Sequence, residues 1–269
     1  MLPPKKSLGQ HFLRDENIAR NIVESLQLRP MDVVVEIGPG QGALTKHLAG
    51  RGAGLTVVEV DKRAVNLLRD SFGDAIKIVH ADVRTVSLEE IARGTGARLR
   101  IVGNIPYNIT SEILFWLFDS RASVEDATLM VQLEVAQRFV ARKETKEYGI
   151  LSIYLQLYAE TELLFKVSRN SFFPRPAVDS AVVRLSFNHD LPDFNEDLFR
   201  AIVRGTFGKR RKTLRNGLRF MGFSDDVLDG CTLDLSRRPE TLLVGDYLLL
   251  TNQLGASACP PGPKARNRR

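Results

Sequence analysis

The polar stretch VGNIPYNIT, residues 102–110, follows an apolar run and brings together groups that could act on an aromatic amine. Such an amine is a weak nucleophile because its lone pair is delocalised into the ring. The side-chain oxygen of Asn104 and the carbonyl of Ile105 could hold both amino hydrogens and favour a pyramidal nitrogen. Pro106 would stiffen the turn, and a base could stack on Tyr107, which is worth about 1–3 kcal/mol. A plain helix-entry turn with Tyr107 packed inside is the alternative.

A glycine loop at residues 36–42, EIGPGQG, supplies a second cluster. Glycines such as Gly38 and Gly40 let the backbone approach a ligand closely at the carboxyl edge of a parallel sheet. Together with Ala43 they also satisfy the dinucleotide-binding pattern, and Glu59 lies where that pattern expects an acid, about 20 residues on. A tight strand-to-helix turn without a ligand is the structural alternative.

The charges beside this loop favour S-adenosylmethionine over a dinucleotide. Glu36 would face a pyrophosphate at close range, an unfavourable like-charge contact, whereas it suits a ligand with an ammonium group. Asp82, after the third predicted strand, could accept a hydrogen bond from an adenine amino group, while Glu59 could accept bonds from ribose hydroxyls. Methyl displacement needs mainly the alignment of nitrogen, methyl carbon and sulfur. It demands no metal, and no acid beside the loop suits the hydride transfer of a nicotinamide oxidoreductase.

Composition excludes several other classes of protein. The chain of 269 residues is 43% hydrophobic and 26% charged, as is typical of soluble globular proteins. No apolar run reaches the length of about 18 residues that suggests a membrane span, and no secretory leader is visible. Two cysteines, Cys231 and Cys259, and four scattered histidines provide neither a disulfide framework nor metal-ligand spacing. We therefore expect a cytoplasmic protein that binds neither a membrane nor a metal.

The net charge of +6 is concentrated in one block. Between Arg200 and Arg219 there are eight basic residues and no acid. Because solvated helix faces normally mix both signs, this block favours a polyanion partner, in particular a nucleic acid. A solvated face without a partner is the alternative. The candidate contacts are Arg204, Lys209, Arg210, Arg211, Lys212 and Arg215.

Apolar runs that alternate with helical patterns between residues 30 and 135 predict a doubly wound α/β sheet. Such short runs indicate parallel strands that are buried on both faces. The expected strands are 33–37, 55–60, 76–79, 100–103 and 128–133, and the expected helices are 43–49, 63–72 and 111–118. Two further runs, 162–167 and 181–187, predict an antiparallel pair at the sheet edge. The sheet is thus Rossmann-like and mostly parallel, with an antiparallel edge strand.

After about residue 190 the apolar period is helical only, which indicates a small all-α domain. The expected helices of this domain are 196–204, 210–219, 224–230 and 241–254, and two earlier ones, 135–142 and 150–158, precede the antiparallel pair. The tail combines prolines with basic residues and has no apolar periodicity, so we expect disorder there. We predict a cofactor-binding catalytic domain over 1–189, a basic helical domain over 190–255 and a basic tail over 256–269.

Taken together, the motifs resemble the ribosomal RNA adenine N6-dimethyltransferase family, the small-subunit dimethyladenosine transferases. The resemblance runs from about Lys6 to Leu254. The motifs are QHFL at 10–13, EIGPGQGALT at 36–45, EVD at 59–61, NIPYNI at 104–109, MVQ at 130–132, FxPxPxVDS at 172–180 and RRKTLRN at 210–216. Leu133 departs from the family pattern, in which many relatives carry a lysine, and could alter an RNA contact.

The resemblance implies a class I methyltransferase that uses S-adenosylmethionine and releases S-adenosylhomocysteine. It implies that two neighbouring adenosines near the 3′ end of 16S rRNA, in the small ribosomal subunit, each receive two methyl groups during late assembly. The target base must be unstacked, and the basic helical domain would hold RNA phosphates. Since no heptads or self-pairing edges are visible, we expect a monomer.

The resemblance also implies residue roles. The implied cofactor contacts are His11, Leu13, Gly38, Glu59, Asp82 and Asn104, to which the charge and loop arguments add Glu36 and Gly40. The implied target-base contacts are Asn104, Pro106, Tyr107 and Phe172, the last on the second face of the base. Without the resemblance, Phe172 is more typical of a core aromatic beside a turn.

Two rival functions remain open at this stage. One is a resistance methylase that acts on large-subunit rRNA, against which the long helical C-terminal domain argues. The other is a ribosome-assembly factor whose catalysis is dispensable. The intact set of Asn104, Pro106, Tyr107, Glu59 and Asp82 weighs against a pure binder.

Overall fold

The structure is a computed structural model that describes residues 2–49, 51 and 54–257, and it divides into two units. Unit 1 combines Met1–Val140 with Tyr158–His189, and unit 2 combines Ala141–Leu157 with Asp190–Arg269. One junction lies after residue 189, where the sequence analysis placed its domain boundary. The segment Ala141–Leu157, however, packs with the helical unit and not with the first domain. Most of the expected tail lies outside the described residues.

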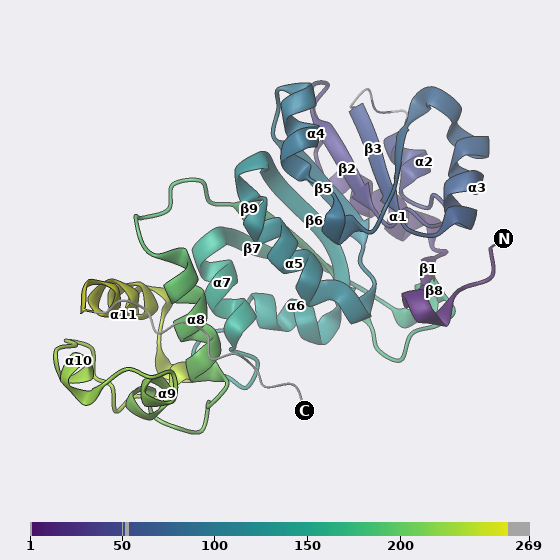
Figure 1. Cartoon of the computed structure of the whole chain (residues 1–269). Coiled ribbons are helices and arrows are strands. Elements are labelled where there is room, and N and C mark those ends of the chain that lie inside the picture. Colours follow the sequence, from purple (N-terminus) through teal and green to yellow (C-terminus); the bar gives the residue numbers. More distant parts are fainter. Residues whose placement is uncertain (1, 50, 52–53, 258–269) are drawn as a thin grey trace, which may run out of the picture. The chain divides into compact units, whose positions relative to one another are not determined.

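Unit 1 is built on a seven-stranded sheet with the order β4-β3-β2-β5-β6-β9-β7 (Figure 1). Strands β4, β3, β2, β5 and β6 are parallel, and β9 is antiparallel to both of its neighbours, β6 and β7. The predicted fold class is therefore confirmed. The bounds are β2 Val33–Ile37, β3 Gly54–Glu59, β4 Lys77–His80, β5 Leu99–Asn104, β6 Val124–Gln132, β7 Ala159–Val167 and β9 Ser180–Phe187.

Strand β6 begins at Val124, four residues before the predicted start, because the charged pair Glu125-Asp126 hides the beginning of its apolar pattern. The Asp126 carboxylate is buried and pairs with Arg100 of β5 at 2.5 Å. Arg100 also reaches Asp32 at 2.7 Å. The charges compensate one another, and a charged residue can thus occupy an inner strand.

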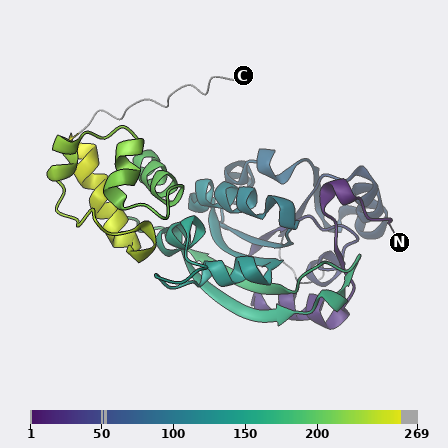
Figure 2. The same cartoon turned by 90° about the horizontal axis from the view of Figure 1, so that it is seen from below.

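Helices cover both faces of the sheet, and Figure 2 shows α1 (purple) and α5 (teal) on opposite sides of the strands. The bounds are α1 Glu16–Ser25, α2 Thr45–Leu48, α3 Lys62–Phe72, α4 Leu88–Thr95, α5 Thr110–Asp119 and α6 Leu133–Phe139. Helices α1 and α4 were not predicted from the sequence. Both begin at a polar N-cap, Asp15 and Ser87 respectively, whose side chain accepts backbone N–H bonds of the first turn.

Gly103 allows β5 to pass close to β2 just before the strand ends. A Cβ at this position would lie 2.7 Å from the carbonyl oxygen of Ile37, so any side chain would force the two strands apart. The close approach brings Asn104, the last residue of β5, to the same sheet edge as the glycine loop after β2.

A separate two-stranded ribbon joins the N-terminus to a distant part of unit 1. β1 (Phe12–Leu13) pairs antiparallel with β8 (Phe172–Phe173), and both lie near the N-terminus in Figure 1. We call residues 5–13 the N-terminal strap. It contains the 3₁₀ turn Lys6–Leu8 and ends in β1.

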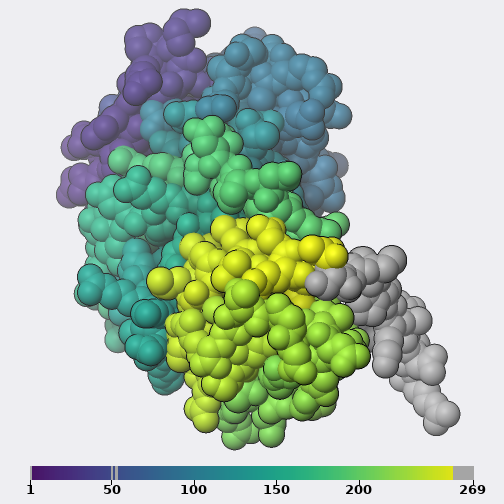
Figure 3. Space-filling model, turned by 90° about the vertical axis from the view of Figure 1, so that its left-hand side faces the viewer, coloured from purple at the N-terminus to yellow at the C-terminus, as the bar shows by residue number. Residues whose placement is uncertain are grey.

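Unit 2 is helical, and α11 (yellow) packs alongside its other helices in Figure 3. The bounds are α7 Ile150–Tyr158, α8 Glu196–Phe207, α9 Leu214–Phe220, α10 Asp225–Asp229 and α11 Val244–Ser257. Helix α9 begins four residues later than predicted because Thr213 caps it, its hydroxyl accepting from the backbone N–H of Asn216. Residues 210–212 therefore form a turn and not the first turn of a helix. None of the helices in the described part of the chain is long and apolar enough to cross a membrane.

Candidate active site

A pocket in unit 1 lies where β2, β3 and β5 end, and residues 7–13 of the strap form part of its wall. This is the carboxyl edge at which doubly wound sheets bind ligands. The structure brings ten of the predicted residues together in the pocket lining. They are His11, Leu13, Glu36, Gly38, Gly40, Glu59, Asp82, Asn104, Pro106 and Tyr107.

The glycine loop leaves open space beside Gly38 and packs closely against the Phe12 ring at Gly40. Gly38 has φ +61°, and a Cβ built on it would meet no atom within 4 Å. Gly40 has φ +56°, and its N–H donates to Oε2 of Glu59 at 3.0 Å. Both backbone conformations favour glycine, so the loop is shaped to let a ligand lie against the main chain.

Glu59, at the end of β3, is held by three backbone donors. Besides Gly40, the N–H groups of Val60 and Asp61 donate to its Oε1 at 2.9 and 2.8 Å. Burial raises the pKa of Glu59, and these three hydrogen bonds counteract the rise. Since a carboxylate has about four acceptor positions, the side chain keeps capacity for a ligand hydroxyl while its orientation is fixed.

Glu36, the last but one residue of β2, is 1% exposed and lies in the pocket wall. Burial raises its pKa to about 8, and the neighbouring charge of Glu59 acts in the same direction. The hydroxyl of Thr45 donates to Glu36 Oε2 at 2.7 Å. Two desolvated acids this close favour a cationic ligand, because its charge relieves their repulsion.

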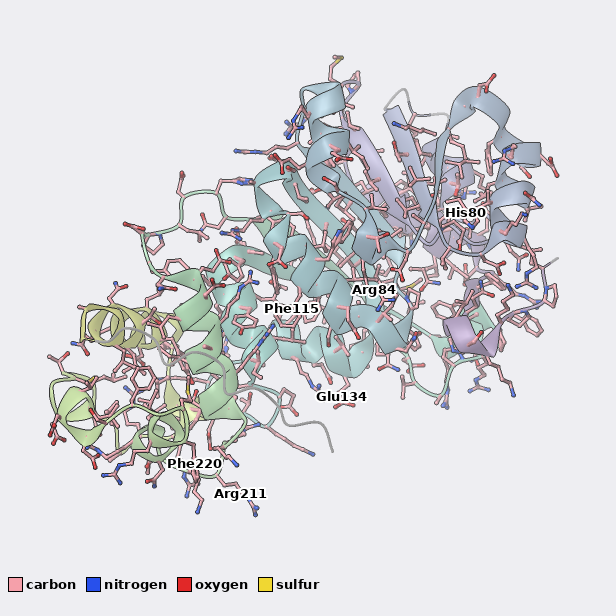
Figure 4. All side chains as sticks on the ribbon, in the orientation of Figure 1. His80, Arg84, Phe115, Glu134, Arg211 and Phe220 are labelled. Carbon is pink, nitrogen blue, oxygen red and sulfur yellow. The ribbon has the colours of Figure 1, made fainter. Side chains whose placement is uncertain are left out.

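Asp82 lines the pocket but is already engaged by Arg84, which the sequence analysis did not single out. The carboxylate accepts from the backbone N–H, from Nε and from Nη2 of Arg84, at 3.0, 3.0 and 2.5 Å. The hydrogen bonds from Arg84 lower the pKa of Asp82, which stays ionised. A ligand amino group would therefore share Asp82 with Arg84 (Figure 4), which also lines the pocket.

Asn104 presents its side-chain oxygen to the pocket because its amide nitrogen is used elsewhere. Nδ2 donates to the carbonyl oxygen of His11 at 2.8 Å, and Oδ1 accepts from no described residue. The orientation matches the predicted use of this oxygen as an acceptor. The strap thus both covers the pocket and sets the rotamer of Asn104.

Tyr107 is anchored at its hydroxyl and at one face of its ring. The hydroxyl shares a 2.7 Å hydrogen bond with Ser180, and burial raises the Tyr107 pKa. The His11 imidazole stacks on the ring with centroids 5.5 Å apart, and its Nδ1 lies 2.7 Å from the Pro174 carbonyl oxygen. A target base would thus find the ring already oriented by His11.

Phe172 does not lie in the pocket, contrary to its expected place on the second face of the target base. In the two-residue strand β8 successive side chains point to opposite faces. Phe172, opposite Leu13, is 4% exposed within the core cluster, whereas Phe173 is 42% exposed and lies under Arg14, whose Cζ is 4.1 Å from the ring centroid. The structure thus agrees with the core-aromatic alternative.

Asp61 fastens the strap, and sequence reasoning gave it no role. Its carboxylate, 1% exposed, accepts from Lys5 Nζ at 3.1 Å, from Gln10 Nε2 at 3.2 Å and from the Arg63 guanidinium at 2.6 Å. These hydrogen bonds, led by that of Arg63, hold the pKa of Asp61 well below its usual range. Its backbone N–H also orients Glu59. The available signal was its spacing, since an aspartate one residue before a helix is a preferred N-cap.

The six basic residues predicted to contact RNA all lie in unit 2, and they differ in whether their side chains already bind other groups of the protein. Arg215 pairs with Asp225 and Asp229 at 3.3 and 2.7 Å, and Arg210 donates to the carbonyl oxygens of residues 145–146. The exposed members are Arg204, Lys209, Arg211 and Lys212, of which the last three form no ion pair with any described residue.

The fold and the pocket together define a class of protein. A doubly wound sheet carries, at its carboxyl edge, an open glycine loop, a held acid after β3, a further acid after β4 and an Asn-Ile-Pro-Tyr turn after β5. This is the arrangement of a Rossmann-like, S-adenosylmethionine-dependent methyltransferase, and its buried acids fit a cofactor that bears positive charge.

Residues 2–248 match the family model described as ribosomal RNA adenine dimethylase, and the chain belongs to this family. Its substrate is accordingly ribosomal RNA. A curated relative, the ribosomal RNA small subunit methyltransferase A of Chlorobium phaeobacteroides (strain BS1), is 45% identical over 250 residues, which cover 93% of each chain.

Two solved structures are similar over most of their length. A dimethyladenosine transferase from Plasmodium falciparum has a TM-score of 0.77 at 25% identity and covers 91% of this chain and 98% of its own. The 23S rRNA methyltransferase ErmE has a TM-score of 0.66 at 30% identity and covers 91% and 99%.

Proposed function

We propose that this protein transfers methyl groups from S-adenosylmethionine to N6 of two adjacent adenosines near the 3′ end of 16S rRNA, making each N6,N6-dimethyladenosine. It acts as a monomer on the small ribosomal subunit, in the cytoplasm, during ribosome assembly. The observation that carries the proposal is the free Oδ1 of Asn104, aimed into a pocket that also holds the acids of a cofactor site.

Chain residues divide the work of holding the cofactor, which supplies an activated methyl group when bound. Glu59 accepts the ribose hydroxyls, Asp82 accepts the adenine amino group, and Glu36 faces the ammonium group. Gly38 and Gly40 let the backbone approach, and His11 and Leu13 close the pocket from the strap. Burial of Glu36 and Glu59 strengthens the interactions of these two acids, because there is little water to screen them.

The turn after β5 orients the target amine. Asn104 Oδ1 and the Ile105 carbonyl would accept its two hydrogens and so hold the nitrogen for attack on the methyl group that the cofactor would supply. Pro106 fixes the turn, and Tyr107 supplies a stacking face. These groups act through orientation and preorganised polarity, which together account for large rate factors in enzymes.

Basic side chains of unit 2 bind the phosphates of the RNA. Lys209, Arg211 and Lys212 are exposed cations without ion-pair partners among the described residues, and such groups bind phosphates with release of counterions. Arg204, Arg210 and Arg215 belong to the same predicted set, but Arg210 and Arg215 also have structural partners.

Methylation of large-subunit rRNA is a second candidate, which the similarity to ErmE at 30% identity favours. The small subunit is preferred because relatives that bear the small-subunit name reach 45% identity. An assembly factor with dispensable catalysis is the remaining rival, and the assembled pocket weighs against it.

The test is transfer of labelled methyl from S-adenosylmethionine to unmethylated small subunits, followed by nucleoside analysis. Large subunits and free adenosine are the substrate controls, and Asn104→Ala is the enzyme control. Dimethyladenosine formed on small subunits alone supports the proposal. Label on large subunits alone would favour the second candidate, and tight subunit binding without transfer would favour the assembly factor.

A further inference from the structure

Phe220, the last residue of α9, exposes 69% of its surface although the helix is amphipathic. Leu214 and Leu218, four residues apart, bury the inner face of α9 together with Gly217. Phe220 lies off that face, so its ring does not contribute to the core of unit 2. Since the exposed ring contributes little burial to the fold, its surroundings decide whether it is a candidate for contact with a partner.

The ring lies beside the basic turn that precedes α9. Lys209 Nζ is 5.0 Å from the centroid of Phe220, a cation–π distance. Arg211 and Lys212 follow in the same turn, both exposed and without an ion-pair partner among the described residues. In Figure 4 the labelled Arg211 and Phe220 both point out from the helices of unit 2.

Hydrogen bonds hold the backbone of the turn in a defined conformation. The backbone N–H of Lys212 donates to the Lys209 carbonyl at 2.7 Å, and Arg210 donates to two carbonyl oxygens of residues 145–146 at 3.0 and 3.1 Å. Arg210 thus serves the fold, while the three residues around it present their charges outward. A prearranged cluster loses little conformational freedom when a ligand binds.

Acids nearby do not cancel these charges. Asp225 accepts from Arg219 at 2.7 Å and from Arg215 at 3.3 Å, and Asp229 pairs with Arg215 at 2.7 Å. Asp225 and Asp229 of α10 are therefore paired with Arg215 and Arg219 and not with the cations of the turn. The turn and Phe220 combine uncompensated positive charge with an open aromatic face.

We infer that Phe220, with Lys209, Arg211 and Lys212, forms a binding site for an unpaired nucleotide of RNA, whose base stacks on Phe220 and whose flanking phosphates meet the three cations. Proteins recognise unpaired RNA bases by stacking on aromatic side chains, and every base offers such a face. The inference rests on the proposed function in that the RNA belongs to the ribosomal substrate.

The experiment compares two probes that carry the same charge: a ten-nucleotide oligoadenylate, and the same ribose-phosphate chain without bases. Phe220→Leu should weaken oligoadenylate binding about tenfold and leave binding of the abasic chain unchanged. Phe220→Trp should bind oligoadenylate as well as the native protein does. Its added fluorescence should be quenched by oligoadenylate but not by the abasic chain, with the native protein and its single tryptophan as the background.

Leu249→Ala is the matched control, since it shortens another exposed apolar side chain of unit 2, 43% exposed. It should change neither affinity. Equal loss for both probes in Phe220→Leu, or no loss for either, would overturn the inference. So would weaker binding of whole subunits with unchanged oligoadenylate binding, which would indicate a protein partner instead. If the native protein methylates no rRNA, the proposed function fails, yet the base-dependent quenching still reports separately on this site.

Discussion

The cofactor pocket of unit 1 and the basic turn of unit 2 differ in the sign of their charged side chains and in how far these side chains are exposed to solvent. In the pocket, Glu36 and Glu59 are 1% and 5% exposed and hold their positions through Thr45 and backbone N–H groups. In the turn, Arg211 and Lys212 are exposed, and their side chains form no ion pair with any described residue. On the proposed function, the first region would hold a small cationic cofactor at short range, and the second would attract a polyanion.

This difference predicts different responses to salt and pH. Exposed charges are screened by ions in solution, whereas buried ones are screened much less. Cofactor affinity should thus depend on the protonation of the acids, and RNA affinity on ionic strength. The following four variants test that separation, and they are ordered from the largest expected effect to the smallest.

Asn104→Ala should lower kcat about 10²–10³-fold, because it removes a preorganised acceptor at the reacting nitrogen. Subunit affinity should remain within about twofold, since the basic turn is untouched. Single-turnover methyl transfer and a subunit-binding titration measure the two quantities. A parallel collapse of RNA binding would mean that the pocket itself grips the RNA.

Glu36→Gln should stabilise the protein without cofactor, and more so at pH 8 than at pH 5. The unfolded chain ionises Glu36 near pH 4.5, whereas the folded protein keeps its proton up to about pH 8. The folded state therefore binds more protons across that window, and this group makes unfolding easier as the pH rises through it, by an amount on the order of a few kcal/mol.

The measurement for Glu36→Gln is the Tm of native protein and variant at several pH values. The gap should widen from pH 5 to pH 8 and then level off, while cofactor affinity falls in the variant. A gap that does not change with pH would mean that Glu36 is ionised in the folded protein throughout.

Neutralising Arg211 and Lys212 together, as Arg211→Gln with Lys212→Gln, should weaken RNA binding about tenfold at moderate salt. The slope of log affinity against log salt should become shallower by about 1.4, because two phosphate contacts to a single strand are lost. Arg215→Gln is the control, and its effect should be smaller since Arg215 is already paired with Asp225 and Asp229. An unaltered slope would mean that the cations of the turn contact solvent and do not contact RNA phosphates.

Lys5→Met should raise the Kd for S-adenosylmethionine about two- to fivefold, as expected for the loss of one partly exposed ion pair. Lys5 reaches the buried Asp61 at 3.1 Å and so fastens the strap over the pocket. Lys6→Met changes the neighbouring exposed lysine and should leave the Kd unaltered. Isothermal titration measures the Kd of both variants. A raised Kd in Lys5→Met alone means that the Lys5–Asp61 ion pair is responsible, and a raised Kd in both means that positive charge near the pocket is responsible.

Periodicity and motif spacing predicted the sheet because its inner strands are nearly continuous apolar runs. Prediction failed where charge or capping interrupted the pattern. The start of β6 was missed since Asp126 is compensated by Arg100 from another strand, and no local signal shows that partner. α9 was predicted to start at Arg210, yet the Thr213 hydroxyl ends the turn and begins the helix.

The pocket residues at the ends of β2, β3 and β5 and after β4 were predictable because parallel strands end at one edge of a sheet. His11 and Leu13 were indicated only by the family resemblance. The contacts of two residues, Phe172 and Asp61, were not predictable, since these contacts join segments that are distant in the sequence. Phe172 was expected at the target base, but the pairing of β1 with β8 places it against Leu13 in the core. Asp61 had no predicted role because its partners Lys5 and Gln10 lie more than 50 residues earlier.

The strap has a consequence for the order in which the protein is made. His11 meets the Pro174 carbonyl across 163 residues of chain, and β1 has its partner in Phe172–Phe173. During synthesis the strap therefore leaves the ribosome well before β8, the segment with which it pairs. A nascent chain shorter than about 174 residues holds the glycine loop and the Asn104 turn but not the ribbon that seats the strap. Full closure of the pocket by the strap is thus reserved for a chain that already includes β8.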